Sequence, residues 1–367
     1  MMMLPYRFIP LLLRDVLALL EQLLPPRPTS FFRPYRFSRA DLDKIFSGDG
    51  DRSGELLLPI DATTIETIQK AINESTSVVG SYFDILSYNI NNVAAYDTLR
   101  RQSILHAIFS SGAHVVLLQE TNSQWEEIIL LRKKDLYRYS YFHHPGSDDR
   151  AAGGIAILSQ FPLEDVRVID FSKNVPGSVF PAVVCGVRLP IRYQRGESLI
   201  THDLSINVAI VHLRPPVELD GTAWLETARI TGPIRLREVQ ELMKRTAVGG
   251  GRMSLHVIAG DFNEGDDSEA ITHLTNLGYN NALRTFVPRW KETHTWPFMR
   301  NLLTLRKRLD HILWRDGPLF GTVTNGRSDE FEHNILLQCI GCGVVTGYEN
   351  GASDHQPVLS RFAFMTG

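Results

Sequence analysis

Cysteine is scarce in this chain of 367 residues, which contains only Cys185, Cys339 and Cys342. So small and odd a number excludes the disulfide framework on which small secreted domains rely. Cys339 and Cys342 have the spacing of a metal or redox pair, but no second Cys or His pair of matching spacing accompanies them. We therefore expect buried structural thiols here rather than a zinc site.

An excess of charge of one sign is also lacking, since the net charge is −3 and the pI is about 6.5. Binding to a polyanion would need a local basic patch or a metal ion, and non-specific binding to duplex nucleic acid is disfavoured. The hydrophobic content of 43% is enough to bury a substantial core. These values predict a globular protein with one large domain or two ordinary ones.

No apolar run is long enough to span a bilayer. Residues 1–26 are rich in leucine, but Arg7, Pro10, Arg14, Asp15 and Glu21 interrupt every window of sufficient length. No small-residue cleavage site follows, so we expect no signal peptide and favour a cytoplasmic location. The leucines of 11–24 predict a helix that packs on a partner domain or lies on a membrane surface.

Residues 1–80 predict a mostly helical N-terminal extension. Within 38–75, Asp49, Asp51, Ser53 and Gly54 resemble the calcium loop of an EF-hand, with helices expected on both sides. The twelfth loop position is Ile60, where calcium needs a bidentate carboxylate. A degenerate hand or a solvated Asp/Gly turn is therefore expected.

From residue 81 the pattern changes to alternating strands and helices. Apolar runs predict strands over 83–90, 113–118, 153–159, 180–187, 206–211 and 256–259, and periodicity predicts helices over 97–110 and 224–244. This alternation predicts an α/β domain that extends from 81 to 367.

Polar side chains stand where these strands end. Asp261 and Asn263 are two positions apart and share a face of an extended segment, although Gly-Asp-x-Asn alone fits a turn equally well. Asp310 precedes an apolar run that a buried charge can enter only with a partner, which the adjacent Asp354 and His355 supply. Oxygen ligands suit Mg²⁺ or Mn²⁺ and histidines suit proton transfer, so the set predicts a phosphate-ester site. Its members are Asn89, Glu120, His212, Asp261, Asn263, Asp310, Asp354 and His355.

In their order and setting these motifs resemble the endonuclease/exonuclease/phosphatase superfamily, which includes deoxyribonuclease-like nucleases, bacterial-type sphingomyelinases and inositol-polyphosphate phosphatases. The resemblance covers about 82–364 and implies a four-layer αββα sandwich of two mixed β-sheets flanked by helices, with the site at the mouth between the sheets. It is carried by Ser87-Tyr88-Asn89, Leu118-Gln119-Glu120, the strand 154–159, Val211-His212-Leu213, Gly260-Asp261-Phe262-Asn263, the run 308–312 and Ser353-Asp354-His355.

The resemblance implies Mg²⁺- or Mn²⁺-dependent hydrolysis of a phosphate ester by in-line attack of water. Asn89 and Glu120 would hold the metal, with Asp354 as a further ligand or as support for one.

The same resemblance implies the catalytic roles. Asp261 would orient or deprotonate the attacking water, and Asn263 would position the water and the phosphate. Asp310 would hold His355 in the tautomer that donates to a phosphoryl oxygen. His212 would stabilise the transition state or protonate the leaving oxygen.

The sequence leaves the substrate open between nucleic acid, a phospholipid head group and a small phosphate ester. A lipid-directed enzyme, similar to sphingomyelinases or phosphoinositide phosphatases, is one alternative. A catalytically silent scaffold of the same fold, with its N-terminal helix as the docking element, is another. Arg214 and Arg308 stand beside the motifs, either as phosphate contacts or as solvated side chains. We expect a monomer.

Overall fold

The computed structural model describes residues 36–37 and most of 82–366. The gaps in the second range are 134–135, 145–151, 196–197, 217–223, 248–254, 288–294, 301–302, 316–320, 323–334, 346–347 and 349–351. The predicted leucine-rich helix and the calcium-loop-like turn lie outside the described residues. Among the described helices, none is both long enough and apolar enough to cross a bilayer.

The first sheet is mixed and has seven strands in the order β1-β15-β16-β2-β3-β5-β4. Its parallel pairs are β1 with β15 and β2 with β3, and its other pairs are antiparallel. The strands are β1 (Arg36–Phe37), β2 (Tyr82–Asn89), β3 (Val115–Thr121), β4 (Tyr139–His143), β5 (Gly154–Ser159), β15 (Ile335–Val345) and β16 (Val358–Thr366).

The second sheet is also mixed, with the order β10-β13-β9-β8-β7-β6 and with β14 paired to β8. Only β8 and β9 run parallel among its described pairs. Its strands are β6 (Leu163–Ile169), β7 (Ala182–Arg195), β8 (Ser198–His212), β9 (Val257–Asp261), β10 (Asn280–Asn281), β13 (Asp310–Trp314) and β14 (Gly321–Thr322). A separate hairpin joins β11 (Trp296–Arg300) to β12 (Leu303–Lys307).

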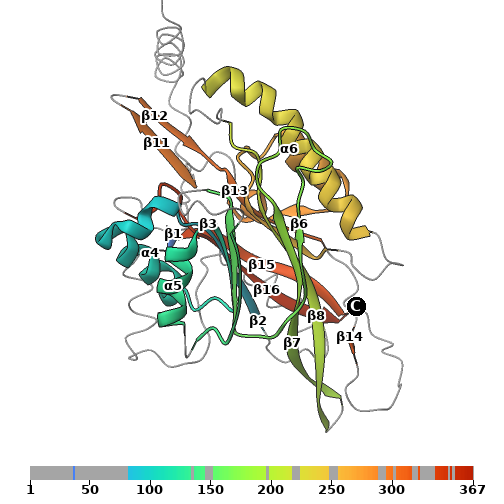
Figure 1. The fold of residues 1–367 in the computed structure, drawn as a ribbon. Coiled ribbons are helices and arrows are strands. Elements are labelled where there is room, and N and C mark those ends of the chain that lie inside the picture. The colour runs from blue at the N-terminus through green and yellow to red at the C-terminus, as the bar shows by residue number, and fades with distance from the viewer. Residues whose placement is uncertain are drawn as a thin grey trace, which may run out of the picture.

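Helices cover the outer faces of the sheets, with α4 and α5 on one side and α6 on the other (Figure 1). Asp97 begins α4 by accepting hydrogen bonds from the backbone N–H groups of Leu99 and Arg100. Asn122 caps α5 in the same way. The helices are η1 (Asn92–Tyr96, a 3-10 helix), α4 (Thr98–Ser110), α5 (Ser123–Arg132), α6 (Trp224–Ala247), α7 (Glu269–Asn276) and α8 (Ala282–Phe286).

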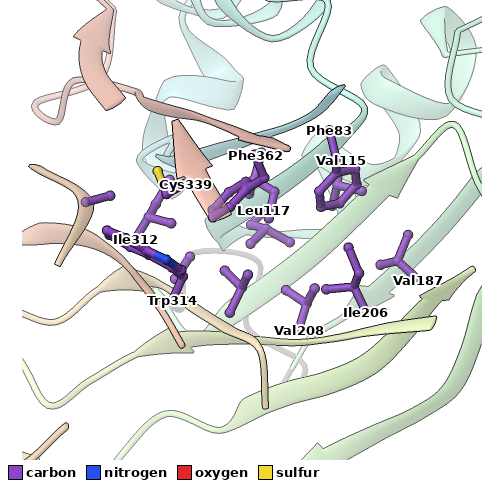
Figure 2. Packing of buried hydrophobic residues seen from close by; sticks show 14 of the residues in the cluster. Phe83, Val115, Leu117, Val187, Ile206, Val208, Ile312, Trp314, Cys339 and Phe362 are labelled. Carbon is purple, nitrogen blue, oxygen red and sulfur yellow. The ribbon is translucent and has the colours of Figure 1, made fainter. Parts of the chain in front are cut away.

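Alternation along the strands produces three buried layers of side chains. On β2, Phe83 and Ile85 belong to the core between the sheets, which also contains side chains of the second sheet such as Val208. Figure 2 shows Phe83 and Val208 among the side chains of this core. Leu86 and Tyr88 point the other way, into the layer under α4 and α5. A third layer lies between the second sheet and α6 and α7. The predicted α/β architecture of two mixed sheets with flanking helices is therefore confirmed.

Some elements differ from the prediction. The strands over 180–187 and 206–211 are longer, because β7 and β8 continue as a hairpin ribbon that pairs through Arg195 and Ser198. Helix α5 was not predicted. Cys339 and Cys342 lie on β15 as buried free thiols, as expected.

Candidate active site

Four polar side chains of the site lie on the same face of their strands as the apolar residues of the core between the sheets. On β9, Val257 and Ala259 belong to the core between the sheets, and Asp261 follows at the same parity. Ala259 is the last residue of β9 in this core. Asp261, two positions further on the same face, therefore lies at the mouth between the sheets. The same alternation places Asn89 on β2, His212 on β8 and Asp310 on β13.

Strand register brings three of these residues side by side. Asp261 pairs with His212 across the parallel β8–β9 ladder and with Asp310 across the antiparallel β9–β13 ladder. Gly260 makes the close approach possible, since a Cβ there would lie 1.9 Å from the carbonyl oxygen of Val211. Its φ of 144° also belongs to the region that glycine alone adopts readily.

Glu120 reaches the site through a β-bulge. Alternation alone would direct it toward the helices with Leu118, but the register with β5 shifts between Gln119 and Thr121, and Glu120 has a φ of 57°. Its carboxylate instead accepts hydrogen bonds from Asn89 Nδ2 (2.9 Å) and from the backbone N–H of Asn92 (3.3 Å). The bulge thus moves this acid from the helix-facing side to the mouth.

Asp261 is the centre of the site and is 1% exposed. Its Oδ2 accepts a hydrogen bond from Asn89 Nδ2 (3.1 Å) and lies 3.6 Å from Nε2 of both His212 and His355. Its Oδ1 accepts the backbone N–H of Asn263 (2.8 Å). Burial raises the pKa of Asp261, and the neighbouring charge of His355 opposes that rise.

His355 forms a buried pair with Asp310, with its Nδ1 2.8 Å from Asp310 Oδ2. Burial alone would lower the pKa of His355, but the charges of Asp310 and Asp261 outweigh it and raise that pKa well above its usual value. This raised pKa favours the protonated ring, whose Nε2 lies 3.6 Å from Asp261 Oδ2. Thr295 fixes the start of β13, because its Oγ1 accepts the backbone N–H of Asp310 (3.0 Å).

His212 has the opposite electrostatic character. Its ring stacks on Phe180 with centroids 4.4 Å apart, and burial lowers its pKa. Its Nδ1 lies 3.1 Å from the carbonyl oxygen of Ala152, which can only accept a hydrogen bond. Nδ1 therefore carries the proton of the neutral ring, and Nε2 faces Asp261 as an acceptor.

Asp354 carries the site to the protein surface. It is exposed, and its Oδ1 accepts a hydrogen bond from Asn91 Nδ2 (2.7 Å). Partial burial would raise the pKa of Asp354, but the charge of His355 and the hydrogen bond from Asn91 outweigh burial and lower that pKa.

The pKa of Glu120 shifts in the opposite direction, since burial and the charge of Asp354 raise it to about 7.

Behind the site, Arg235 of α6 connects two strand ends. Its Nε donates to Glu264 Oε1 (2.6 Å), and its Nη1 donates to the carbonyl oxygen of Arg214 (2.8 Å) and to Thr231 Oγ1 (2.8 Å). Arg214 follows His212 on one segment and Glu264 follows Asp261 on the other. Arg235 is 4% exposed, so this arrangement holds the two loops together away from solvent.

Seven of the eight predicted side chains therefore gather at one mouth. Asn263 takes part through its backbone N–H, because its φ of 53° ends the extended segment and its Nδ2 donates to the Leu213 carbonyl oxygen (3.0 Å). Several supporting groups were not predicted: Asn91, Phe180, Thr295, the Ala152 carbonyl and Ser353, whose Oγ donates to the Asn89 carbonyl oxygen (2.6 Å) and accepts the His355 N–H (3.1 Å). Ser353 and Asn91 could have been suspected from their positions beside Asp354 and Asn89. Arg308 is not solvated, because it is buried and its Nη1 bonds to Asp266 Oδ2 (3.1 Å).

Carboxylates at the mouth could hold a metal ion. Asp261, Asp310 and His355 each offer one ligand atom, and these atoms lie within 4.8 Å of one another. The predicted ligands lie at the same mouth at increasing depth, since Asp354 is exposed, Glu120 is half-buried and Asn89 is buried.

Comparison with known families agrees with this geometry. The profile of the Endonuclease/Exonuclease/phosphatase family matches residues 86–355. The chain belongs to this family. Its known members are phosphoesterases. No curated protein matches the chain significantly.

Several solved structures are similar to this chain at low sequence identity. TDP2 from Caenorhabditis elegans is 16% identical, with 88% of this chain and 84% of that chain covered and a TM-score of 0.50. TDP2 from D. rerio, in complex with a single-strand DNA product, is 14% identical, with 77% and 100% covered and a TM-score of 0.49. ANGEL2, a 2',3'-cyclic phosphatase in complex with adenosine-2',3'-vanadate, is 16% identical, with 77% and 96% covered and a TM-score of 0.49.

Proposed function

We propose that this chain hydrolyses a phosphate ester with water as the nucleophile and with Mg²⁺ or Mn²⁺ as its cofactor. The position of Asp261 supports this most directly, because its Oδ2 lies 3.6 Å from Nε2 of both His212 and His355. A buried carboxylate can accept a proton from water while a charged imidazole beside it stabilises phosphoryl oxygens.

The charges at the mouth fit a divalent cation. Four carboxylates converge there, from Glu120, Asp261, Asp310 and Asp354, and His355 is the one histidine of the site whose pKa is raised. Burial, and then the charge of Asp354, raise the pKa of Glu120 to about 7. A cation would relieve the repulsion, and oxygen ligands of this kind suit Mg²⁺ and Mn²⁺.

We assign the ion to Asn89, Glu120 and Asp354 rather than to Asp261, Asp310 and His355. In the second set His355 Nδ1 is already bonded to Asp310 Oδ2 at 2.8 Å, which leaves the ring to donate a hydrogen bond rather than to bind a metal. The first set offers oxygen atoms alone, which suit Mg²⁺ and Mn²⁺ better than a set with an imidazole. The bound ion would supply positive charge that neutralises the phosphoryl oxygens.

The side chains then divide the reaction between them. Asp261 takes the proton of the attacking water, and the raised pKa makes it a stronger base. The bond from the water oxygen to phosphorus forms as the bond to the leaving oxygen breaks on the opposite side. Asn263 orients the water and the phosphate, and its N–H holds Asp261 Oδ1.

The two histidines act on the charge that develops. His355, held by Asp310, donates its Nε2 proton in a hydrogen bond to a phosphoryl oxygen. His212 stabilises the transition state, or protonates the leaving oxygen after Nε2 has taken up a proton, because Nε2 carries none in the neutral ring.

A substrate panel tests this function. The purified full chain is assayed with Mg²⁺ or Mn²⁺ against bis(p-nitrophenyl) phosphate, single-stranded oligonucleotides, a phosphoinositide and sphingomyelin. We expect metal-dependent hydrolysis of at least one substrate and a rate roughly a hundredfold lower in Asp261→Asn, which keeps the size of the side chain. A folded, metal-loaded protein that hydrolyses none of them contradicts the proposal.

A further inference from the structure

Three large hydrophobic side chains are exposed in one short segment next to the candidate site. Val93 is 48% exposed, Tyr96 53% and Leu99 75%. Val93 and Tyr96 lie on η1, where a repeat of three residues per turn places them on the same face, and Leu99 follows in the first turn of α4. These three residues are called the apolar ridge below.

The apolar ridge inverts the usual pattern of a surface helix. The side chains that η1 buries are Asn92, Ala94 and Ala95, whereas its larger Val93 and Tyr96 face solvent. Folding alone favours the reverse, because burying a large apolar side chain contributes more than burying an alanine. The outward face of η1 therefore suits contact with something outside this chain.

Hydrogen bonds join the ridge to the mouth of the site. The backbone N–H of Val93 donates to Asn91 Oδ1 (3.2 Å), and Asn91 Nδ2 donates to Asp354 Oδ1 at the surface (2.7 Å). At the other end, Arg100 Nε donates to the carbonyl oxygen of Ala352 (2.7 Å). The ridge is thus fixed against the loop that carries Asp354.

A groove of mixed polarity continues from Leu99 along α4. It has a volume of about 730 Å³, and its lining includes Leu99 and Phe109 but also Gln102, His106 and Arg132. Leu99 thus belongs both to the ridge and to the wall of this groove.

We propose that the apolar ridge inserts into the surface of a lipid membrane and that the substrate is the phosphate ester of a lipid head group. This inference rests on the proposed phosphoesterase function. Exposed aliphatic side chains with a tyrosine at an apolar–polar boundary are the chemistry of elements that lie in the interface of a membrane.

Single-stranded nucleic acid fits the ridge less well. Tyr96 is the single aromatic side chain of the ridge, and the polar groups nearest to it at the mouth are the carboxylates and amides of Asp354, Glu120 and Asn91. Proteins that bind single strands combine a row of aromatic rings with a positively charged groove. A lipid needs only apolar contact beside a site for its phosphate.

Vesicle binding tests the ridge itself. The full chain and a Val93→Ser/Leu99→Ser variant are floated with phosphatidylcholine vesicles, with and without phosphatidylserine. The control is Ile230→Ser, which removes a side chain of similar exposure (52%) on α6. We expect the ridge variant to bind roughly tenfold more weakly and the control to bind like the unaltered protein. Equal binding by all three proteins overturns the proposal.

Kinetics separate this inference from the proposed function. Both variants are assayed on soluble bis(p-nitrophenyl) phosphate and on vesicles that contain sphingomyelin or a phosphoinositide. We expect unchanged rates on the soluble ester and a rise of roughly tenfold in KM on vesicles for the ridge variant alone. If the soluble ester is hydrolysed but vesicles are not, or if the ridge variant instead loses activity on a single-stranded oligonucleotide, the lipid assignment is wrong while the phosphoesterase function stands. If no ester is hydrolysed, the proposed function fails, and with it the lipid substrate.

Discussion

His355 Nδ1 and Asp310 Oδ2 lie 2.8 Å apart and join the two sheets of the sandwich at the mouth. Asp310 belongs to β13 of the second sheet, whereas His355 lies on the loop that leads into β16 of the first. The pair therefore orients a charged imidazole and fixes the position of one sheet against the other.

The first prediction follows from this pair. His355→Ala should lower kcat by roughly a hundredfold at saturating metal, because the donor to the phosphoryl oxygen is lost. Asp310→Asn should cost less, since it removes only the group that orients the ring. The double variant should be little slower than His355→Ala alone. Additive losses in a double-mutant cycle of kcat would show that Asp310 acts independently of His355.

The second prediction concerns Glu120. Glu120→Gln removes a negatively charged ligand but keeps the shape of the side chain, so metal affinity should fall. The Mg²⁺ concentration for half-maximal rate should rise roughly tenfold or more, and excess metal should restore much of kcat. In His355→Ala the main loss should instead be in kcat rather than in the metal dependence. An unaltered metal titration for Glu120→Gln would place the ion elsewhere, with the Asp261–Asp310–His355 group next in line.

The third prediction is a pH dependence of metal affinity. Only the deprotonated carboxylate of Glu120 can bind the ion, and its pKa is raised to about 7 in the metal-free protein. Below that pH a proton competes with the metal, so affinity should increase as pH rises, by up to about tenfold per unit, and should level off above about 7. Mg²⁺ titrations of the initial rate at several pH values provide the measurement. Glu120→Gln should lack this slope, and a flat profile in the unaltered protein would argue against the assignment.

The fourth prediction tests Arg235. A lysine cannot reach Glu264, Thr231 and the Arg214 carbonyl oxygen at once, because it lacks the planar fork of guanidinium donors. Arg235→Lys should therefore let the His212 and Asp261 segments shift, and kcat should fall by roughly tenfold with little change in KM. Arg237→Lys, at an exposed position of the same helix, is the control. If Arg235→Lys lowers only thermal stability and leaves kcat unchanged, Arg235 has a purely structural role.

The fifth prediction concerns the glycine before Asp261. Gly260→Ala would place a Cβ 1.9 Å from the Val211 carbonyl oxygen, at a φ of 144° that alanine rarely adopts. We expect a loss of about 3 kcal/mol or more in the free energy of unfolding, measured by urea denaturation. Gly265→Ala is the matched control, because nothing lies within 4 Å of the added Cβ. Similar stability of the two variants would contradict this account of the β8–β9 approach.

Much of this site could be predicted because its residues obey the alternation of their strands. Asp261 and Asn89 extend the inward faces of β9 and β2, so their direction follows from the apolar residues before them. Asp310 was predicted to need a partner for its buried charge, and His355 provides it.

Other features depend on contacts that no local pattern reveals. The parity of β3 would send Glu120 toward the helices, and only the bulge opposite Gly154 turns it to the mouth. Arg308 is paired by Asp266, a residue 42 positions away, so its burial could not be inferred from its neighbours. Arg235 donates hydrogen bonds to two loops, at Glu264 and at the Arg214 carbonyl oxygen. These bonds depend on how α6 packs against the second sheet.

The division of the site between two sheets has a further consequence. Asn89, Glu120 and His355 come with the first sheet, whereas His212, Asp261 and Asp310 come with the second. The rate of the proposed reaction should therefore depend on how the two sheets are aligned. The core drawn in Figure 2 sets that alignment. A cavity created deep in that core, as by Val208→Ala, should slow the reaction at temperatures where circular dichroism still records a folded protein.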